Sequence, residues 1–114
     1  MRSTLEAVRD SLKSPPASFE EAVARIAEAL RPEQIILFGS RARGDHRVDS
    51  DYDILVITRD GEPHELARAA SKVLRGREFA LDLLALPQAH IAERIGTSTL
   101  LKRIFHEGKV LYEA

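Results

Sequence analysis

The spacing of apolar residues predicts two helices at the start of the chain. In the first, residues 4–13, apolar positions repeat at the interval of one helix face, and the Ser-Pro-Pro sequence at 14–16 ends it. The second begins at Ser18, which forms a capping box with Glu21, and ends before Pro32. Its apolar stripe consists of Phe19, Ala22, Val23, Ile26, Ala27 and Leu30.

Short apolar runs predict the strands of a sheet. Residues 34–38 (QIILF) form an unbroken apolar run, typical of a strand buried on both faces, which ends at Gly39 and Ser40. Further strands are predicted at 51–58, 79–86 and 109–112, the second of these stopped by Pro87.

Helical spacing returns between these strands. Pro63 suits the first turn of a helix whose apolar face runs from Leu66 to Leu74, with Gly76 as its C-terminal cap. Two more helices are predicted at 89–95 and 98–106. The resulting order, ααβ(α)βαβααβ, indicates an α/β protein of the α+β type, with a small mixed β-sheet packed against helices.

Composition places the chain among globular proteins. Its 114 residues predict a single domain, with residues 1–14 as an N-terminal helical extension, and 44% of them are hydrophobic. The absence of cysteine excludes a disulfide framework, a thiolate metal site and a cysteine nucleophile. Charged residues near the start exclude a signal peptide or membrane span there, so a cytoplasmic location is expected.

Asp51 and Asp53 stand at the start of the second predicted strand. Because side chains alternate across a strand, both carboxylates are expected on the same face. Carboxylates held that close raise each other's pKa unless a cation lies between them. Mg²⁺ prefers carboxylate oxygens and keeps sites open for substrate phosphates. The pattern therefore predicts a magnesium site, and the alternative is a pair of solvated carboxylates.

Asp82 is the only carboxylate inside the apolar run 79–86. Burying an unpaired charge is costly, so a residue of this kind needs a partner. One interpretation is an ion pair with Arg75 or Arg77. The other places this strand beside that of the paired carboxylates, where the three acids share a metal cluster and Asp82 accepts the proton of an attacking hydroxyl.

Gly39 and Ser40 end the first strand and begin a short turn that Gly44 closes. Free backbone N–H groups at such a helix start bind anionic oxygen, and the serine hydroxyl adds a donor. Arg41 and Arg43 flank the turn, and for them a solvated arginine face is the alternative. Combined with the three acids, this stretch predicts a site for a triphosphate.

The spacing of these residues resembles a known family. Residues 39–53 begin with GS, continue for ten residues and end with DYD. This pattern is similar to the G-S-x10-D-x-D signature of the DNA polymerase β-like nucleotidyltransferase superfamily. The runs 38–44 (FGSRARG) and 50–56 (SDYDILV) resemble its minimal nucleotidyltransferase (MNT) branch. The resemblance covers nearly the whole chain from about Phe19 onward and implies the polymerase β-like nucleotidyltransferase fold.

The resemblance also implies a role for each matching residue. Asp51 and Asp53 would ligate two Mg²⁺ ions, and Asp82 would bind one ion and activate the acceptor hydroxyl. ATP would be the substrate, attacked at its α-phosphorus with release of pyrophosphate. The nucleotide-binding residues would be Gly39, Ser40, Arg41, Arg43 and Ser50.

The family further implies a partner. Minimal nucleotidyltransferases are often encoded beside a HEPN-domain toxin, which they bind and adenylylate as the antitoxin of the pair. A chain of this length leaves little surface for its own acceptor-recognition module, so a partner protein in a hetero-oligomer is expected to supply the acceptor. The formal net charge of −1 gives no global attraction to nucleic acid or to an anionic membrane.

Three functions therefore remain as alternatives at this point. The first is a transferase that modifies a protein partner. The second is a transferase acting on a small molecule or a nucleic acid end, which would need a basic or aromatic acceptor groove, although aromatic residues make up only 5% of the chain. The third is a protein-binding antitoxin module whose catalysis is incidental.

Overall fold

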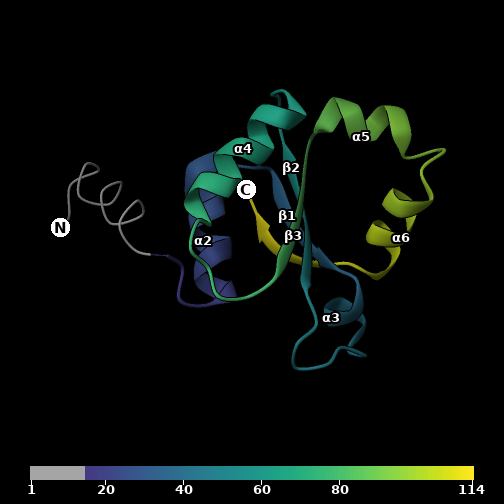
Figure 1. Cartoon of the computed structure of the whole chain (residues 1–114). Coiled ribbons are helices and arrows are strands. Elements are labelled where there is room, and N and C mark those ends of the chain that lie inside the picture. Colours follow the sequence, from purple (N-terminus) through teal and green to yellow (C-terminus); the bar gives the residue numbers. More distant parts are fainter. Residues whose placement is uncertain (1–14) are drawn as a thin grey trace.

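The computed structural model describes residues 15–114, so the helix predicted at 4–13 lies outside the described residues. Helices and strands follow one another along the chain in the order that the apolar pattern predicts (Figure 1). The helices are α2 (Phe19–Leu30), α3 (Ser40–Arg43), α4 (Pro63–Val73), α5 (Gln88–Arg94) and α6 (Thr99–Glu107). The strands are β1 (Gln34–Phe38), β2 (Tyr52–Thr58), β3 (Leu81–Pro87) and β4 (Lys109–Glu113).

Helix α2 begins and ends at the predicted signals. The Ser18 side chain accepts the N–H of Glu21 at 3.1 Å, and the Glu21 carboxylate accepts the N–H of Ala17 at 3.1 Å. At the other end Arg31 adopts a left-handed conformation with φ 47°, and Pro32 follows it. The chain therefore turns directly from α2 into β1.

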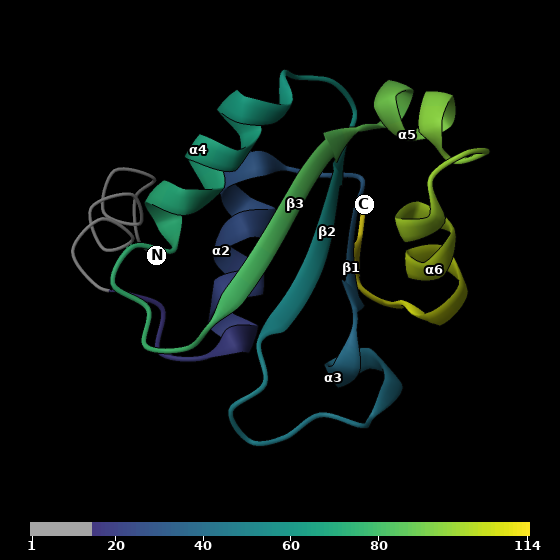
Figure 2. The same ribbon diagram turned by 45° about the vertical axis from the view of Figure 1, so that its right-hand side comes forward.

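The strands form one mixed sheet in the order β3-β2-β1-β4, as Figure 2 shows. Strand β2 pairs with β1 in antiparallel and with β3 in parallel orientation, and β4 is antiparallel to β1. The parallel pair is connected through α4, as a parallel connection requires. The small mixed sheet packed against helices is thus confirmed.

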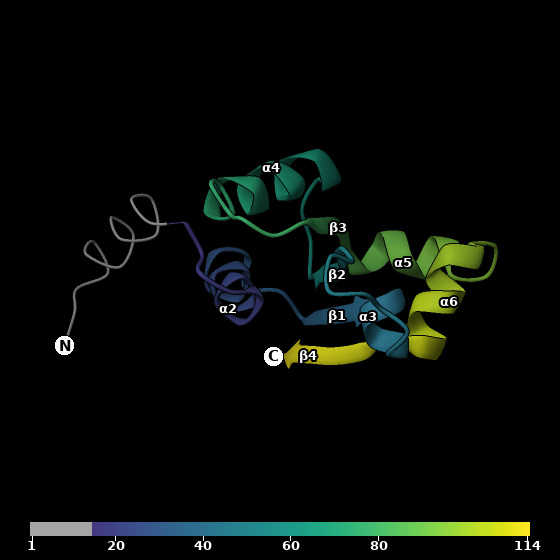
Figure 3. The same ribbon diagram turned by 60° about the horizontal axis from the view of Figure 1, so that its bottom comes forward.

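The alternation of side chains along the strands divides the core between the two faces of the sheet. Ile54 and Val56 belong to the cluster under α2 and α4, whereas Leu55 and Ile57 belong to the cluster under α5 and α6. Figure 3 shows the two pairs of helices on opposite sides of the sheet.

Among residues 15–114, no helix is both long enough and apolar enough to span a bilayer.

Several element boundaries differ from the sequence prediction by one residue, and two differ by more. Strand β3 begins at Leu81 and includes Pro87, which pairs with Thr58. Proline is tolerated there because β3 is an edge strand, where one side of the backbone needs no partner. Helix α4 ends at Val73, three residues before Gly76, so the predicted cap at Gly76 is wrong.

Candidate active site

The predicted acids gather at one end of the sheet, where β1 ends and β2 and β3 begin. Asp53 is paired with Phe38 of β1 and with Asp82 of β3. By alternation Asp53 shares a face with Leu55, and Asp82 shares one with Leu84, and both of these residues belong to the α5–α6 side of the core. The two strands adjoin, as one interpretation of Asp82 expects. Their carboxylates therefore project from neighbouring strands on one face of the sheet.

Asp53 is the least exposed of the three acids. Burial raises the pKa of its carboxyl above the ordinary value, and the nearby charges of Asp82 and then Asp51 raise it further. The positive charge of Arg43 opposes this shift and lowers the pKa. The repulsion between paired carboxylates that the sequence predicts is thus present at Asp53.

Asp82 is exposed, and the argument that a buried charge requires a partner was wrong for this residue. Its strand is an edge strand, so the side chain remains in contact with solvent. Within residues 15–114 Asp82 forms no ion pair, and Arg77 donates instead to the carbonyl oxygen of Leu81 at 3.2 Å. Its position beside Asp53, rather than its burial, makes it a candidate site residue.

The chemistry of these carboxylates suits a hard divalent cation. Their oxygens are the ligands that Mg²⁺ prefers, and a cation among them would relieve the repulsion at Asp53. In the described part of the chain no group of three or more acidic or histidine side chains is placed to hold a metal ion. Mg²⁺ needs fewer protein ligands than that, because it takes one or two carboxylates together with substrate phosphates and water.

Gly39 lies directly against the Asp53 carboxylate. Its backbone, with φ 75° and ψ −158°, adopts a conformation found essentially only for glycine. A Cβ atom at this position would lie 2.4 Å from Oδ2 of Asp53. The absence of a side chain at Gly39 therefore lets the turn after β1 approach the acids.

The turn after β1 forms the short helix α3, which ends at Gly44 as predicted. The N–H of Gly39 donates to Oε1 of Glu107 at 3.3 Å. In contrast, the N–H groups of Ser40 and Arg41 and the Ser40 hydroxyl meet no acceptor or donor among residues 15–114. Of the two amides predicted for phosphate, the structure leaves that of Ser40 free and engages that of Gly39.

Arg41 connects α3 to the loop that precedes the acids. Its Nε and Nη2 donate to the carbonyl oxygen of Ser50 at 3.1 and 3.0 Å, and Nη2 also donates to that of Val48 at 3.1 Å. The guanidinium lies 4.0 Å from the ring centroid of Tyr52, which in turn stacks on Phe19. Arg41 therefore holds the backbone before Asp51 and the side chain of Tyr52 after it.

Ser50 and Arg43 also have partners within the chain. The Ser50 hydroxyl accepts the N–H of Arg47 at 2.8 Å and closes a turn of the loop. Arg43 donates from Nε to Asp45 at 3.2 Å and from Nη1 to Glu107 at 3.1 Å. Its Nη2 has no partner in the described residues, so Arg43 retains a free donor beside the acids.

Arg41→Lys is expected to destabilise the fold by about 1–2 kcal/mol, because lysine cannot make the paired bonds to Ser50 or stack flat on Tyr52. Urea denaturation followed by circular dichroism measures this loss. Arg47→Lys is the matched control, since the exposed Arg47 side chain has no partner in residues 15–114, and its change should stay within about 0.5 kcal/mol. Equal stability of the two variants would contradict the role given to Arg41.

The sequence pattern did not single out Glu107 as a site residue. An acid at the end of an amphipathic helix has the pattern of a solvated surface position. Its position beside Gly39 follows from strand register, because Lys109 of β4 pairs with Leu37 of β1. The two strands are antiparallel, so Glu107, two residues before Lys109, lies opposite Gly39, two residues after Leu37.

Comparisons with known proteins agree with this geometry. Residues 21–114 match the family described as "Polymerase beta, Nucleotidyltransferase". A protein of Methanocaldococcus jannaschii named "Putative protein adenylyltransferase" is 30% identical over 99 residues, which are 82% of this chain and 97% of that protein.

Solved structures share the fold. A structure described as a "putative nucleotidyltransferase" from Sulfolobus solfataricus has a TM-score of 0.60 at 23% identity, over 99% of this chain and 89% of the other. A structure described as a toxin–antitoxin with AMP-PNP has a TM-score of 0.54 at 23% identity, over 85% of this chain and 75% of the other. The family match and the relative together show that this chain belongs to the polymerase β family of nucleotidyltransferases and is a nucleotidyltransferase enzyme.

Proposed function

We propose that this nucleotidyltransferase transfers AMP from ATP to a hydroxyl group of a partner protein, with two Mg²⁺ ions held by Asp51, Asp53 and Asp82. One observation carries the proposal. Asp53 and Asp82 are paired across β2 and β3 on one face, and the glycine turn at Gly39 lies against Asp53. The name of the M. jannaschii relative supports a protein acceptor.

The triphosphate is proposed to bind at the turn after β1. Ser40 offers an N–H and a hydroxyl, and Arg43 offers its Nη2, all three without a partner in the described residues 15–114. Both residues lie next to Asp53, whose pKa responds to the charge of Arg43. Arg41 and Ser50, which we predict from the resemblance as nucleotide-binding residues, hold the loop through Nε and Nη2 of the arginine and the serine hydroxyl, and of the Arg41 nitrogens only Nη1 lacks a partner among residues 15–114. We assign the phosphate contact to Arg43 rather than to Arg41, because Arg43 is the more exposed of the two and its charge acts on Asp53.

Asp82 is proposed to act as the general base. A bond forms between the acceptor oxygen and the α-phosphorus, the bond to pyrophosphate breaks, and the proton of the hydroxyl passes to the Asp82 carboxylate. Bound Mg²⁺ supplies charge neutralisation for the phosphates during this displacement. The exposure of Asp82 favours this role, because an acceptor on another molecule can reach it.

The partner is proposed to be a toxin of the HEPN type, with this chain as its antitoxin in a hetero-oligomer. The structural similarity to a toxin–antitoxin complex supports a toxin as partner. The exposure of Asp51 and Asp82 at the end of the sheet also suits an acceptor carried by a macromolecule.

Asp82→Asn is expected to slow transfer by about 10²–10⁴-fold, the usual contribution of a general base, because the amide cannot accept the proton. Binding of the nucleotide should change much less, since Asp51 and Asp53 remain. Single-turnover kinetics measure the first quantity and equilibrium binding measures the second. A rate within twofold of the wild type would remove Asp82 from the mechanism.

A labelling experiment tests the proposed function. The purified chain is incubated with Mg²⁺, each α-³²P-labelled nucleoside triphosphate in turn and the protein encoded by the neighbouring gene, and the products are separated on a denaturing gel. We expect label on the neighbouring protein, from ATP in preference to the other nucleotides, and none with Asp53→Asn. Label on a small molecule or a nucleic acid end would support the second function instead. A tight complex without any label would identify a protein-binding module.

A further inference from the structure

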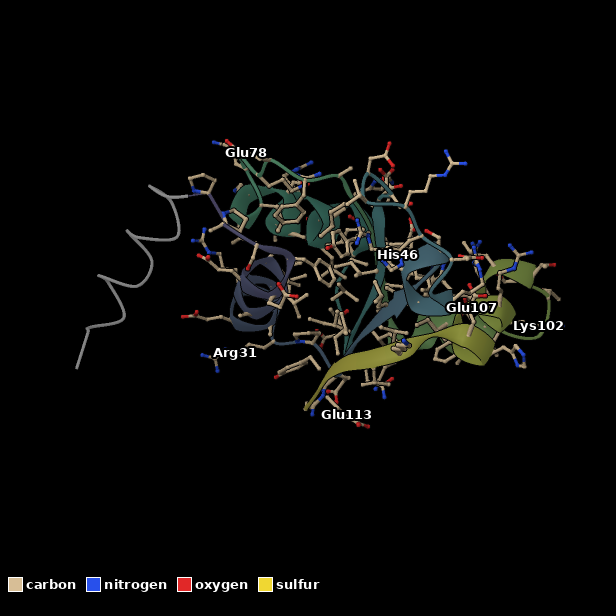
Figure 4. All side chains as sticks on the ribbon, turned by 90° about the horizontal axis from the view of Figure 1, so that it is seen from below. Arg31, His46, Glu78, Lys102, Glu107 and Glu113 are labelled. Atoms are coloured by element: carbon tan, nitrogen blue, oxygen red, sulfur yellow. The ribbon has the colours of Figure 1, made fainter. Side chains whose placement is uncertain are left out.

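We propose that Glu107 is a positioning residue of the nucleotide site, which holds Arg43 and the Gly39 turn ready for a triphosphate. This inference rests on the proposed function, because it assigns the phosphate contact to Arg43. Glu107 lies at the end of α6, next to α3, as Figure 4 shows in the view from below. It links the C-terminal part of the chain to the turn after β1.

The carboxylate of Glu107 makes two contacts through one oxygen atom. Oε1 accepts the N–H of Gly39 at 3.3 Å and Nη1 of Arg43 at 3.1 Å. The Glu107 side chain is only 15% exposed, compared with 42% for that of Arg43. Glu107 is therefore the fixed member of this group, and Arg43 is the member that solvent or a ligand can reach.

The contacts leave the remaining donors of the turn without a partner among residues 15–114. Arg43 uses Nε for Asp45 and Nη1 for Glu107, so its Nη2 stays available. The N–H and hydroxyl of Ser40 also stay available. A triphosphate can therefore be bound at the turn without displacing Glu107 from Gly39.

Glu107 also holds Arg43 in a position where, within residues 15–114, its ion pairs are with Asp45 and Glu107 and not with Asp53. Arg43 lies close enough to Asp53 to lower its pKa. Without the carboxylate of Glu107, the guanidinium would be free to form an ion pair with Asp53 and so compete with a metal ion. Holding Arg43 between Asp45 and Glu107 leaves Asp53 open for a cation.

Equilibrium binding of α,β-methylene-ATP with Mg²⁺ tests the inference, because this analogue binds without being transferred. Glu107→Ala is expected to weaken binding about tenfold, the loss typical of one removed charge-assisted hydrogen bond, without changing the number of binding sites per chain. Glu107→Gln should recover most of the affinity, since its amide oxygen still accepts both bonds. A role limited to folding would lower the number of sites and leave the affinity of the folded fraction unchanged.

A double-mutant cycle with Arg43→Ala identifies the route of the effect. If Glu107 acts through Arg43, the loss caused by Glu107→Ala is smaller in the Arg43→Ala background than in the wild-type background, and the part that remains comes from the bond to Gly39. Should Glu107→Ala fail to fold, the same cycle is run with Glu107→Gln, and a loss of about tenfold that is equal in both backgrounds overturns the inference. Glu33→Ala is the matched control, because it removes a 3.2 Å ion pair with Arg59 at the other end of β1 and should leave binding unchanged.

Two results distinguish failure of this inference from failure of the proposed function. If the wild-type chain binds no nucleotide, the proposed function is wrong. If the wild-type chain binds and Glu107→Ala binds equally well or more tightly, the proposed function stands. In that case the carboxylate of Glu107 is either irrelevant or a competitor of phosphate, and the positioning role is overturned.

Discussion

Asp53→Asn is expected to lower nucleotide transfer by at least about 10³-fold while the fold remains intact. Asp53 is the central acid, since it pairs with Asp82 across the strands and its pKa responds to both Asp82 and Asp51. An asparagine keeps the shape of the side chain but offers no negative charge to a metal ion. A bound metal ion stabilises the transition state by several kcal/mol, and each 1.36 kcal/mol lost slows the reaction about tenfold. Transfer to the partner protein under single-turnover conditions measures this loss.

The same variant should not lose stability in the absence of Mg²⁺. Because burial, Asp82 and Asp51 raise the pKa of Asp53 in the folded chain, the folded state binds its proton more tightly than the unfolded state does. The free energy of unfolding therefore falls as the pH rises from 3.8, the ordinary pKa of an aspartate carboxyl, through the raised pKa of Asp53, and it stays lower at neutral pH. Asp53→Asn removes this penalty.

Urea denaturation at neutral pH, with Mg²⁺ removed by a chelator, compares the two proteins. We expect a midpoint for Asp53→Asn at or above that of the wild type. Added Mg²⁺ should then raise the midpoint of the wild type more than that of the variant, because binding to the folded state stabilises it. A variant that is clearly less stable without Mg²⁺ would mean that Asp53 has a structural role. Full activity in the variant would remove the proposed metal site.

Gly39→Ala is expected to produce the second largest effect, a loss of both stability and activity. The backbone conformation of Gly39 alone disfavours any other residue by about 1–3 kcal/mol. In addition, the new Cβ would lie 2.4 Å from Oδ2 of Asp53, so the carboxylate has to move away. Transfer is expected to fall by about 10²-fold or more, as displacements of about 1 Å do at other active sites.

Gly44→Ala separates these two causes. Gly44 also has a positive φ, 86°, but a Cβ there would meet no atom within 4 Å. This control should lose about 1 kcal/mol of stability and keep its activity, because no acid is displaced. Thermal unfolding and transfer assays of the two variants make the comparison. Equal activities would show that the contact between Gly39 and Asp53 is not needed.

Much of the fold follows from local signals in the sequence. Ser18 and Pro32 delimit α2, and the apolar run before Gly39 specifies β1, because capping and backbone restrictions act within a few residues. The sequence also indicates that Asp53 and Asp82 can lie on adjacent strands, because two apolar runs that flank a helix tend to form neighbouring strands.

Other features depend on contacts that no local pattern reveals. The exposure of Asp82 results from the edge position of β3, which sequence spacing does not specify. The partners of Arg41 are carbonyl groups of a loop, and any residue type could supply them. Glu107 reaches Gly39 only through the register between β1 and β4.

A crystal structure of the chain with Mn²⁺ in place of Mg²⁺ and with α,β-methylene-ATP tests the central claim most directly. Mn²⁺ accepts the same oxygen ligands and is located by its anomalous scattering. We predict anomalous peaks in contact with Asp51, Asp53 and Asp82, and a triphosphate held by Ser40 and Arg43. Well-ordered nucleotide and metal bound elsewhere on the chain, with these three carboxylates free, would contradict the account.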